Sequence, residues 1–192
     1  MAGRLFDKLE QEAFRAGIAA RTKASMEWFR STVSNRKVSR AALIGDGPTR
    51  SRQVYGSMYN FQYDPKTKAT LPYYDRFPLC IPVQKAKGGF YGLNLHYLHP
   101  LIRAQFLDEL YDITNNDKYD RTTKMNVTYQ LLKSTSKMRF FKPCLKHYLS
   151  NQIQSPLLLI EPADWEIAIF LPTESFRKVD KNTVWNESRS KF

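Results

Sequence analysis

The sequence predicts an α+β protein, an SH3-like small β-barrel with a helical insertion and a long N-terminal helix. Between residues 59 and 98, aromatic residues alternate with polar ones, and turn residues separate the runs, as is typical of strands. Apolar residues recur at helical spacing in 2–34 and again from 100 onward. Two later apolar runs, 157–161 and 166–172, are joined by one tight turn, as expected for the last strands of such a barrel.

The first predicted element is one amphipathic helix over residues 2–34, which forms an N-terminal segment of residues 1–34. Apolar residues such as Leu5 and Leu9 follow a helical period, and no proline interrupts them. Gly17 is predicted to be tolerated inside this helix at a cost of about 1 kcal/mol relative to alanine. A helix of this length at the start of a chain often packs on a partner or a neighbouring subunit.

Residues 35–56 are predicted to form a basic connector. Gly47 and Pro48 exclude a continuous helix there. Between residues 28 and 52, six arginines and lysines face only Asp46, which gives a local net charge of +5. Two interpretations fit this segment: a solvated linker, or an arm that becomes ordered along a phosphate backbone.

Residues 57–172 are predicted to form the barrel-like core. Pro82 marks its second strand as an edge strand or the site of a bulge, and the Gly88-Gly89 pair is typical of a hairpin turn. The early elements are a strand at 59–63, a turn at 64–67, a strand at 79–84, a hairpin turn at 87–89 and a strand at 90–97.

Helices are predicted to fill an insertion at about 100–153, between the third and fourth strands. Pro100 is suited to the first turn of one helix, Asp120 to the cap of a helix over 121–138, and Pro143 to the start of a third. The strands 157–161 and 166–172 then complete the barrel. The remaining residues, 173–192, are predicted to be a polar tail with one short helix.

The charge balance predicts a polyanionic partner. The chain of 192 residues has 30 Lys and Arg against 18 Asp and Glu, a net charge of +12. Its longest apolar run, 157–160, is far below the roughly 20 residues of a membrane span, so no membrane partner is predicted. Cys80 and Cys144 sit in apolar surroundings and are predicted to be buried reduced thiols of a protein made in the cytoplasm.

Aromatic and basic residues together predict a nucleic-acid interface, because rings stack on bases while cations meet phosphates. Residues 118–150 carry eight Lys and Arg against Asp120 alone, a net charge of +7. The alternatives are a solvated basic face, and aromatic rings that pack the shell of the barrel. The predicted nucleic-acid-binding residues are Arg36, Lys37, Arg40, Arg50, Arg52, Tyr73, Tyr74, Lys133, Lys137, Arg139, Lys142 and Lys146.

Catalysis has weak support in the sequence. No phosphate-binding GxxxxGK[ST] loop is present, and three histidines define no catalytic set without geometry. A metal site made of His96, His99, Cys144 and His147, and a nuclease site made of Glu161, Asp164 and Glu166, are alternatives of low weight. The prediction is a protein that is not an enzyme and carries no metal or cofactor.

Several phrases resemble proteins of T4-like tailed bacteriophages. They are YDPKTKATLPYYDRFPL (63–79), GGFYGLNLHYL (88–98), FFKPCLKHYLS (140–150), DWEIAIFLPTESF (164–176) and the ending VWNESRSKF. Over residues 57–192 the chain is similar to the DNA end protector family of these phages. A neck, tail or baseplate component of the same virions is the alternative.

The resemblance implies a minor virion protein, made in the host cytoplasm, that caps the ends of packaged linear double-stranded DNA. Such a cap shields the DNA from host exonuclease and aids head–tail completion. The implied partners are double-stranded DNA ends and other phage head, neck or tail proteins, and a homo-oligomer is left open. The resemblance assigns no catalytic or contact residue.

Overall fold

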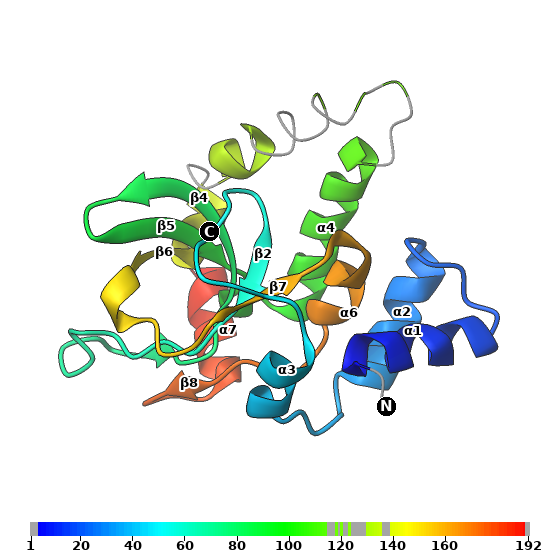
Figure 1. Ribbon diagram of the computed structural model, residues 1–192, viewed down its shortest axis with the longest axis horizontal. Helices are drawn as coiled ribbons and strands as arrows, with labels where there is room; N and C mark the ends of the chain where they lie inside the picture. Colours follow the sequence, from blue (N-terminus) through cyan, green and yellow to red (C-terminus); the bar gives the residue numbers. More distant parts are fainter. Residues whose placement is uncertain are drawn as a thin grey trace.

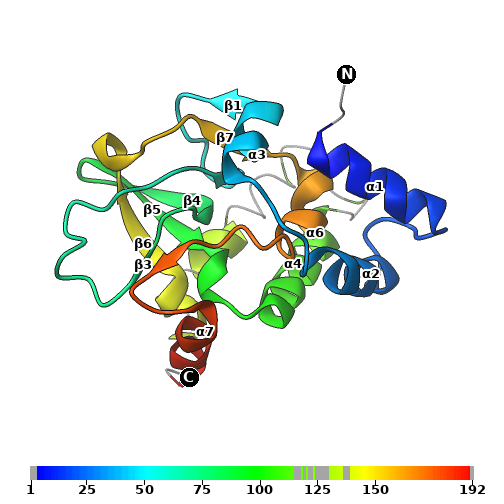
Figure 2. The same cartoon turned by 90° about the horizontal axis from the view of Figure 1, so that it is seen from below.

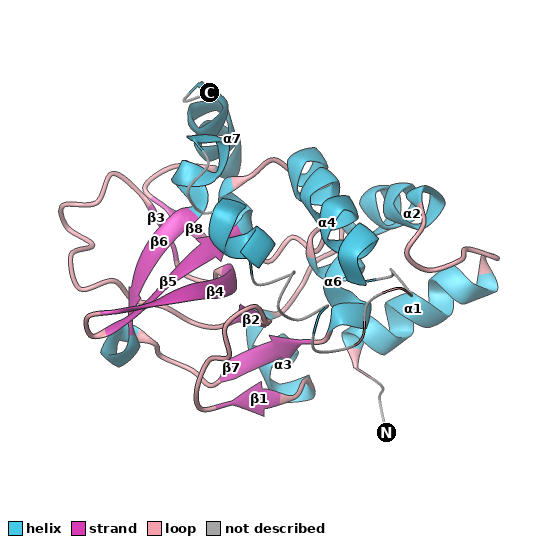
Figure 3. Cartoon of the chain, turned by 90° about the horizontal axis from the view of Figure 1, so that it is seen from above, coloured by secondary structure: helices cyan, strands magenta, loops and turns pink. Residues whose placement is uncertain are grey.

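The computed structural model describes residues 4–114, 118, 120, 123, 130–135 and 139–190. An antiparallel sheet lies in one half of the molecule, and helices α1 (Leu5–Arg15), α2 (Lys23–Val33), α4 (Pro100–Thr114) and α6 (Trp165–Ala168) lie in the other (Figure 1). Figures 2 and 3 show the same separation from below and from above. The helices are α1 Leu5–Arg15, α2 Lys23–Val33, α3 Arg40–Asp46, α4 Pro100–Thr114, α6 Trp165–Ala168 and α7 Lys181–Ser190, with helical residues at 130–135. The 3-10 helices are η1 Leu95–Tyr97, η2 Arg139–Cys144, η3 Ser150–Gln152 and η4 Pro162–Asp164.

The main sheet has six strands in the order β1-β7-β2-β4-β5-β6, and all neighbours are antiparallel. Its strands are β1 Thr49–Arg50, β2 Met58–Asn60, β4 Leu79–Ala86, β5 Gly89–Asn94, β6 Leu145–Leu149 and β7 Leu157–Ile160; β3 Tyr74–Asp75 and β8 Phe176–Arg177 form a separate pair. Within the described ranges the edge strands β1 and β6 do not pair, so the sheet is open. The α+β class is confirmed. The prediction of an SH3-like barrel is wrong, because β1 has only two residues and residues 166–172, expected to be the last strand, begin with a helix.

The hairpin between β4 and β5 agrees with its prediction. Ala86 pairs with Gly89, and Gly88 takes the left-handed conformation with φ of +75° that the short turn requires. The register of the two strands shifts between Pro82 and Gln84, which places the predicted bulge at the proline that cannot donate a ladder hydrogen bond.

The single long N-terminal helix was a wrong prediction, since α1 and α2 have 11 residues each. Gly17 has φ of +72° and ends α1 with paired hydrogen bonds: its N–H donates to the Phe14 carbonyl, and the Ile18 N–H donates to the Ala13 carbonyl. Thr22 then starts α2 through reciprocal capping hydrogen bonds with Ser25. Gly17 therefore ends α1 and Thr22 begins α2, so the segment forms two helices and not one.

Gly17→Ala should lower the free energy of unfolding by about 1–2 kcal/mol, because an L-residue at this positive φ is strained. Gly45→Ala is the matched control: it lies in α3, and an added Cβ meets nothing within 4 Å at either glycine. Urea unfolding of both variants measures the difference. Equal effects would contradict the role assigned to Gly17 in ending α1.

Two elements have the opposite secondary structure to that predicted. Residues 145–149, expected in a helix after Pro143, form strand β6 along β5, with Tyr148 opposite Phe90. Residues 166–172, expected to be a strand, begin with helix α6 and are buried almost throughout. An apolar run that is buried on all sides has no periodicity that separates helix from strand.

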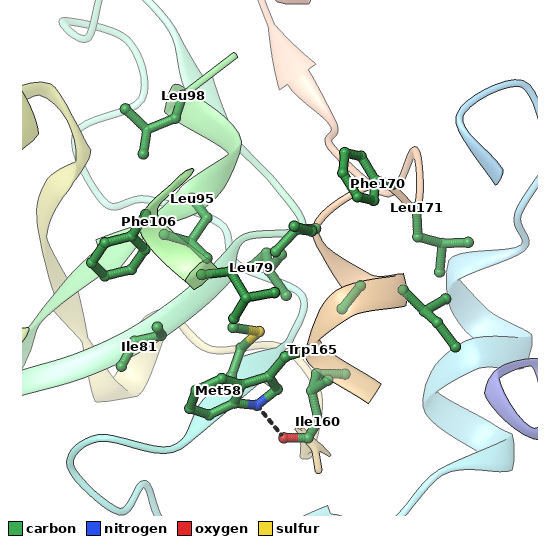
Figure 4. Close-up of a cluster of buried hydrophobic side chains, with 14 of the residues drawn as sticks. Met58, Leu79, Ile81, Leu95, Leu98, Phe106, Ile160, Trp165, Phe170 and Leu171 are labelled. Atoms are coloured by element: carbon green, nitrogen blue, oxygen red, sulfur yellow. Dashed lines mark hydrogen bonds between the residues drawn. The ribbon is translucent and has the colours of Figure 1, made fainter. Parts of the chain in front are cut away.

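Two buried clusters cover the faces of the main sheet. Met58, Leu79 and Trp165 belong to the larger cluster, where the Trp165 Nε1–H donates to the Ile160 carbonyl at 3.0 Å (Figure 4). The smaller cluster is aromatic: Phe61 and Tyr148 meet edge to face with ring centroids 5.3 Å apart. For these rings the interpretation as core packing is the correct one.

The C-terminal segment packs on the body of the protein. In α7, Val184 and Trp185 are buried, and the Trp185 Nε1–H donates to the His96 carbonyl at 2.9 Å. The short helix expected in 173–192 is thus present and is anchored by its tryptophan. No helix in the described part of the chain has both the length and the apolar character needed to cross a membrane.

Candidate nucleic-acid interface

One pocket brings together three of the predicted site residues, Tyr73, Tyr74 and Lys146. It has a volume of about 460 Å³ and lies between the 64–73 loop, β3 and β6. This aromatic pocket is lined by Tyr63, Pro65, Thr67, Leu71, Tyr73, Tyr74, Asp75, Tyr97, Lys146, His147, Tyr148 and Leu149. Neither the loop nor the strand alone contains this set, and the fold assembles it from distant segments.

Ring contacts hold Tyr73 in place. Its ring centroid lies 6.0 Å from that of Tyr97 and 6.5 Å from that of Phe176 in β8. Burial, together with a hydrogen bond to Glu187, raises the pKa of Tyr73 to about 12. The phenol therefore stays neutral over the physiological range, and the pocket keeps uncharged aromatic surface there.

Lys146 supplies positive charge to the same pocket. It lies on β6 opposite Gly92 of β5, and its Nζ is 3.9 Å from the centre of the Tyr97 ring. A lysine ammonium over a tyrosine face is attracted by the π electrons of the ring. The neighbouring His147 is exposed, and its ring lies 5.1 Å from that of Tyr91.

A buried hydrogen-bond network supports the floor of the aromatic pocket. Asp75 Oδ1 accepts from the N–H groups of Phe77 and Ser175, at 3.0 and 2.9 Å. Its Oδ2 meets the Asn94 amide at 3.1 Å and the His96 Nδ1 at 2.6 Å. Burial by itself would raise the pKa of Asp75, but His96 and the two N–H groups hold it below the usual value.

No motif in the sequence predicts this network. His96 Nε2 lies 3.1 Å from the Thr173 hydroxyl, so Asp75, His96 and Thr173 form a line of contacts like that of a catalytic triad. All three residues are at most 4% exposed, which keeps substrate away and makes the line a structural one. Nearby, the fully buried Arg103 donates to the carbonyls of Leu98, Ile169 and His96.

A second pocket contains the predicted residues Arg50 and Arg52. This arginine pocket is lined by Arg50, Ser51, Arg52, Gln53, Ser150, Ile153, Ser155, Pro156 and Leu157, with no carboxylate among them. Both guanidinium groups are exposed, and neither has an ion pair or hydrogen bond to a described residue. Leu149 lines the aromatic pocket, and the next residue in the chain, Ser150, lines the arginine pocket.

The other predicted residues of the connector lie elsewhere. Arg36 forms an ion pair with Glu12 of α1. Arg40 is half-buried and donates to the carbonyls of Thr173 and Glu174 at 2.7 and 2.6 Å. Lys37 is exposed. The connector therefore uses two of its cations to fasten itself to the body of the protein.

The remaining predicted residues belong to the 130–150 region. Lys133 lies in the helical residues 130–135 and is half-buried, and Lys142 is exposed in η2. Arg139 is the first residue of η2, and Lys137 lies outside the described residues. Of the three that the structure describes, Lys133, Arg139 and Lys142, none lines the aromatic or the arginine pocket.

Of the three carboxylates in the nuclease alternative, Asp164 and Glu166 have other partners, and Glu161 is exposed. Asp164 is buried and lies 3.7 Å from an Arg4 nitrogen, and burial raises its pKa to about 6. Glu166 accepts hydrogen bonds from the Ser25 hydroxyl and from the Arg21 N–H. Within the described ranges, no group of three or more His, Cys, Asp or Glu side chains is placed to hold a metal ion.

Comparison with known proteins gives one family. The family model described as "Phage T4 terminal DNA protecting protein" matches residues 3–189, nearly the whole chain. No curated protein and no solved structure matches this sequence. The match extends the resemblance seen in the sequence from residues 57–192 to the N-terminal helices.

Proposed function

The chain belongs to the phage T4 terminal DNA protecting protein family, and from this premise we propose that it covers the ends of linear double-stranded DNA in the phage particle. Members of the family protect DNA ends and are not enzymes, in agreement with the two predictions made from the sequence. The residues that bind DNA, the position in the virion and the protein partners are part of the proposal.

The observation that supports DNA binding best is the aromatic pocket, where Tyr73, Tyr74 and Lys146 meet. Tyrosine rings can stack on any base, and lysine can meet any phosphate, so this combination needs no particular sequence. A protein that covers ends of arbitrary sequence requires such contacts. The exposed arginines of the arginine pocket, Arg50 and Arg52, add charge for the DNA backbone.

Protection then follows from occupation of the end and needs no chemical step. An exonuclease must hold the terminal nucleotide in its own active site, and a bound protein excludes it sterically. If about five phosphates are neutralised, log K should fall against log salt with a slope near −4.5. An affinity for duplex ends that does not depend on salt would contradict this mode of binding.

The proposed function is tested by exonuclease digestion of protein-bound DNA. Purified protein is mixed with blunt linear duplex at moderate salt, and a processive exonuclease is then added. We expect the linear DNA to survive with protein and to be degraded without it. Circular duplex tests whether binding needs an end, and Mg²⁺ without exonuclease tests for a nuclease activity of the protein itself. Unprotected linear DNA would overturn the proposal.

A second candidate function is that of a neck, tail or baseplate part that binds other virion proteins. It is favoured by an apolar groove between α1, α2 and α6, beside which Phe14 is 83% exposed. Exposed aromatic side chains of this kind often mark protein interfaces. Under this alternative the protein binds neither linear nor circular DNA in the experiment above.

A further inference from the structure

The arginine pocket has the chemistry of an anion site. Arg50 and Arg52 both line one hollow, and the residues that line it include no carboxylate. Guanidinium presents its N–H groups as a planar fork that matches phosphate oxygens, and it stays charged at any physiological pH. Two like charges at one hollow repel each other, and a bound anion relieves this repulsion.

Serine hydroxyl groups also line the arginine pocket and are further possible hydrogen-bond donors to an anion. Ser155 is already used, because its Oγ accepts from the Gln62 N–H and donates to the Pro156 carbonyl, each at 2.9 Å. Ser51 and Ser150 also line the pocket, and the structure records no side-chain hydrogen bond from either to a described residue. Two guanidinium groups and two serine hydroxyls provide enough donors for an anion with three exposed oxygens.

A phosphomonoester fits these donors better than a phosphodiester inside a strand. At neutral pH a monoester carries a charge of about −1.5 to −2 and three acceptor oxygens, whereas an internal diester carries one negative charge and two free oxygens. A monoester is also attached to the chain on one side only, so it can enter a hollow from its mouth. An internal phosphate must run through an open groove.

We propose that the arginine pocket binds the terminal phosphomonoester of a DNA strand, with Arg50 and Arg52 as its principal ligands. This inference rests on the proposed function and adds a means by which the protein distinguishes a DNA end from the interior. Because consecutive residues, Leu149 and Ser150, line the aromatic and the arginine pocket, we expect one DNA end to contact both pockets.

The test compares short blunt duplexes of one sequence that carry a 5′-phosphate, a 3′-phosphate or hydroxyls only. Fluorescence anisotropy gives the Kd of each duplex for the wild-type protein and for two double variants. The first is Arg50→Gln/Arg52→Gln. The second is Lys8→Gln/Lys23→Gln, which removes the same charge from exposed positions on α1 and α2.

A terminal phosphate should tighten wild-type binding about tenfold, in line with charge-assisted hydrogen bonds. The arginine double variant should lose this ratio, and the lysine double variant should keep it. Whether the 5′-phosphate or the 3′-phosphate duplex binds more tightly than the hydroxyl-ended duplex identifies the terminus that the pocket binds. Equal Kd values for wild type with all three duplexes, or a ratio that survives in the arginine variant, would overturn the inference.

Exonuclease protection separates this failure from failure of the proposed function. If wild type binds all three duplexes with equal Kd and still protects the hydroxyl-ended duplex, end protection stands and the terminal-phosphate site is refuted. If it protects neither duplex, both proposals fall.

Discussion

Replacement of Asp75 by alanine is expected to lower the free energy of unfolding by about 3–5 kcal/mol, as when one partner of a buried polar pair is removed. The Asp75 carboxylate accepts from Phe77 and Ser175 N–H groups and meets the side chains of Asn94 and His96. All of these groups would lose their partner where water cannot replace it. The β3–β8 pair would lose its anchor to the main sheet.

Urea unfolding followed by circular dichroism measures this loss. Asp64→Ala is the matched control, because Asp64 is a partly exposed aspartate whose ion pair is with Lys68, four residues away, and it should cost less than about 1 kcal/mol. If Asp75→Ala were no more costly than the control, the network could not be what holds the floor of the aromatic pocket.

Asp75 should also make stability depend on pH in the acid range. Its pKa is lowered in the folded state, so its contribution is fully present above the unfolded value of about 3.9. The contribution is lost as pH falls from there through the folded pKa, because the native state must then accept a proton. Urea midpoints of wild type should drop below about pH 4. An Asp75→Asn variant that shows the same acid-dependent drop would contradict this assignment.

Tyr74→Ala/Lys146→Gln should weaken binding to blunt duplex ends by about 2–4 kcal/mol, roughly 30- to 1000-fold in Kd. The Tyr74 substitution removes a surface on which a terminal base can stack, and the Lys146 substitution removes a phosphate contact. The fold should survive, since Tyr74 is only half-buried and Lys146 lies on the edge strand β6. The effect should be largest at low salt, where the lysine contributes most.

Anisotropy titrations with one labelled duplex measure this effect. Phe14→Ala/Lys8→Gln is the matched control, since it also removes one aromatic ring and one charge, but from exposed positions on α1. The control should bind within about twofold of wild type. A control that weakens binding as much as the pocket variant would show that net charge, and not the aromatic pocket, sets the affinity.

Local chemistry made part of the fold predictable. The β4–β5 hairpin follows from Gly88 and from Pro82, and α4 follows from Pro100 and the apolar period behind it. These signals lie within a few residues of the element that they specify. The break after α1 also has a local signal, namely Gly17 and the Thr22–Ser25 capping pair. The prediction of one continuous helix missed it because Gly17 was expected to be tolerated inside that helix.

The rest depends on partners far away in the sequence. Strand β6 exists because β5 offers it a hydrogen-bonding edge, and helix α6 is surrounded by core on every side. Residues 166–172 are apolar almost throughout, so their periodicity cannot show whether they form the last strand of a barrel or a helix. Pairing of this kind appears only when the whole fold is known.

The candidate site shows the same division. Tyr73, Tyr74 and Lys146 were chosen for their chemistry, and only the fold shows that they share a pocket. Local charge counts could not reveal that Arg40 is held by the carbonyls of Thr173 and Glu174. Nor does the local sequence indicate that Asp75, which lies in the short strand β3, anchors a network.

A protein that binds the end of a duplex should distinguish DNA with open ends from DNA without them. The Kd of wild-type protein is measured for an open blunt duplex and for a dumbbell of the same sequence, whose ends are closed by hairpin loops, at the same salt. The open duplex should bind at least about tenfold more tightly, since only it offers a terminal base pair and a strand terminus. Equal affinity for the open duplex and the dumbbell would show that the protein binds duplex DNA along its length, and would contradict the claim.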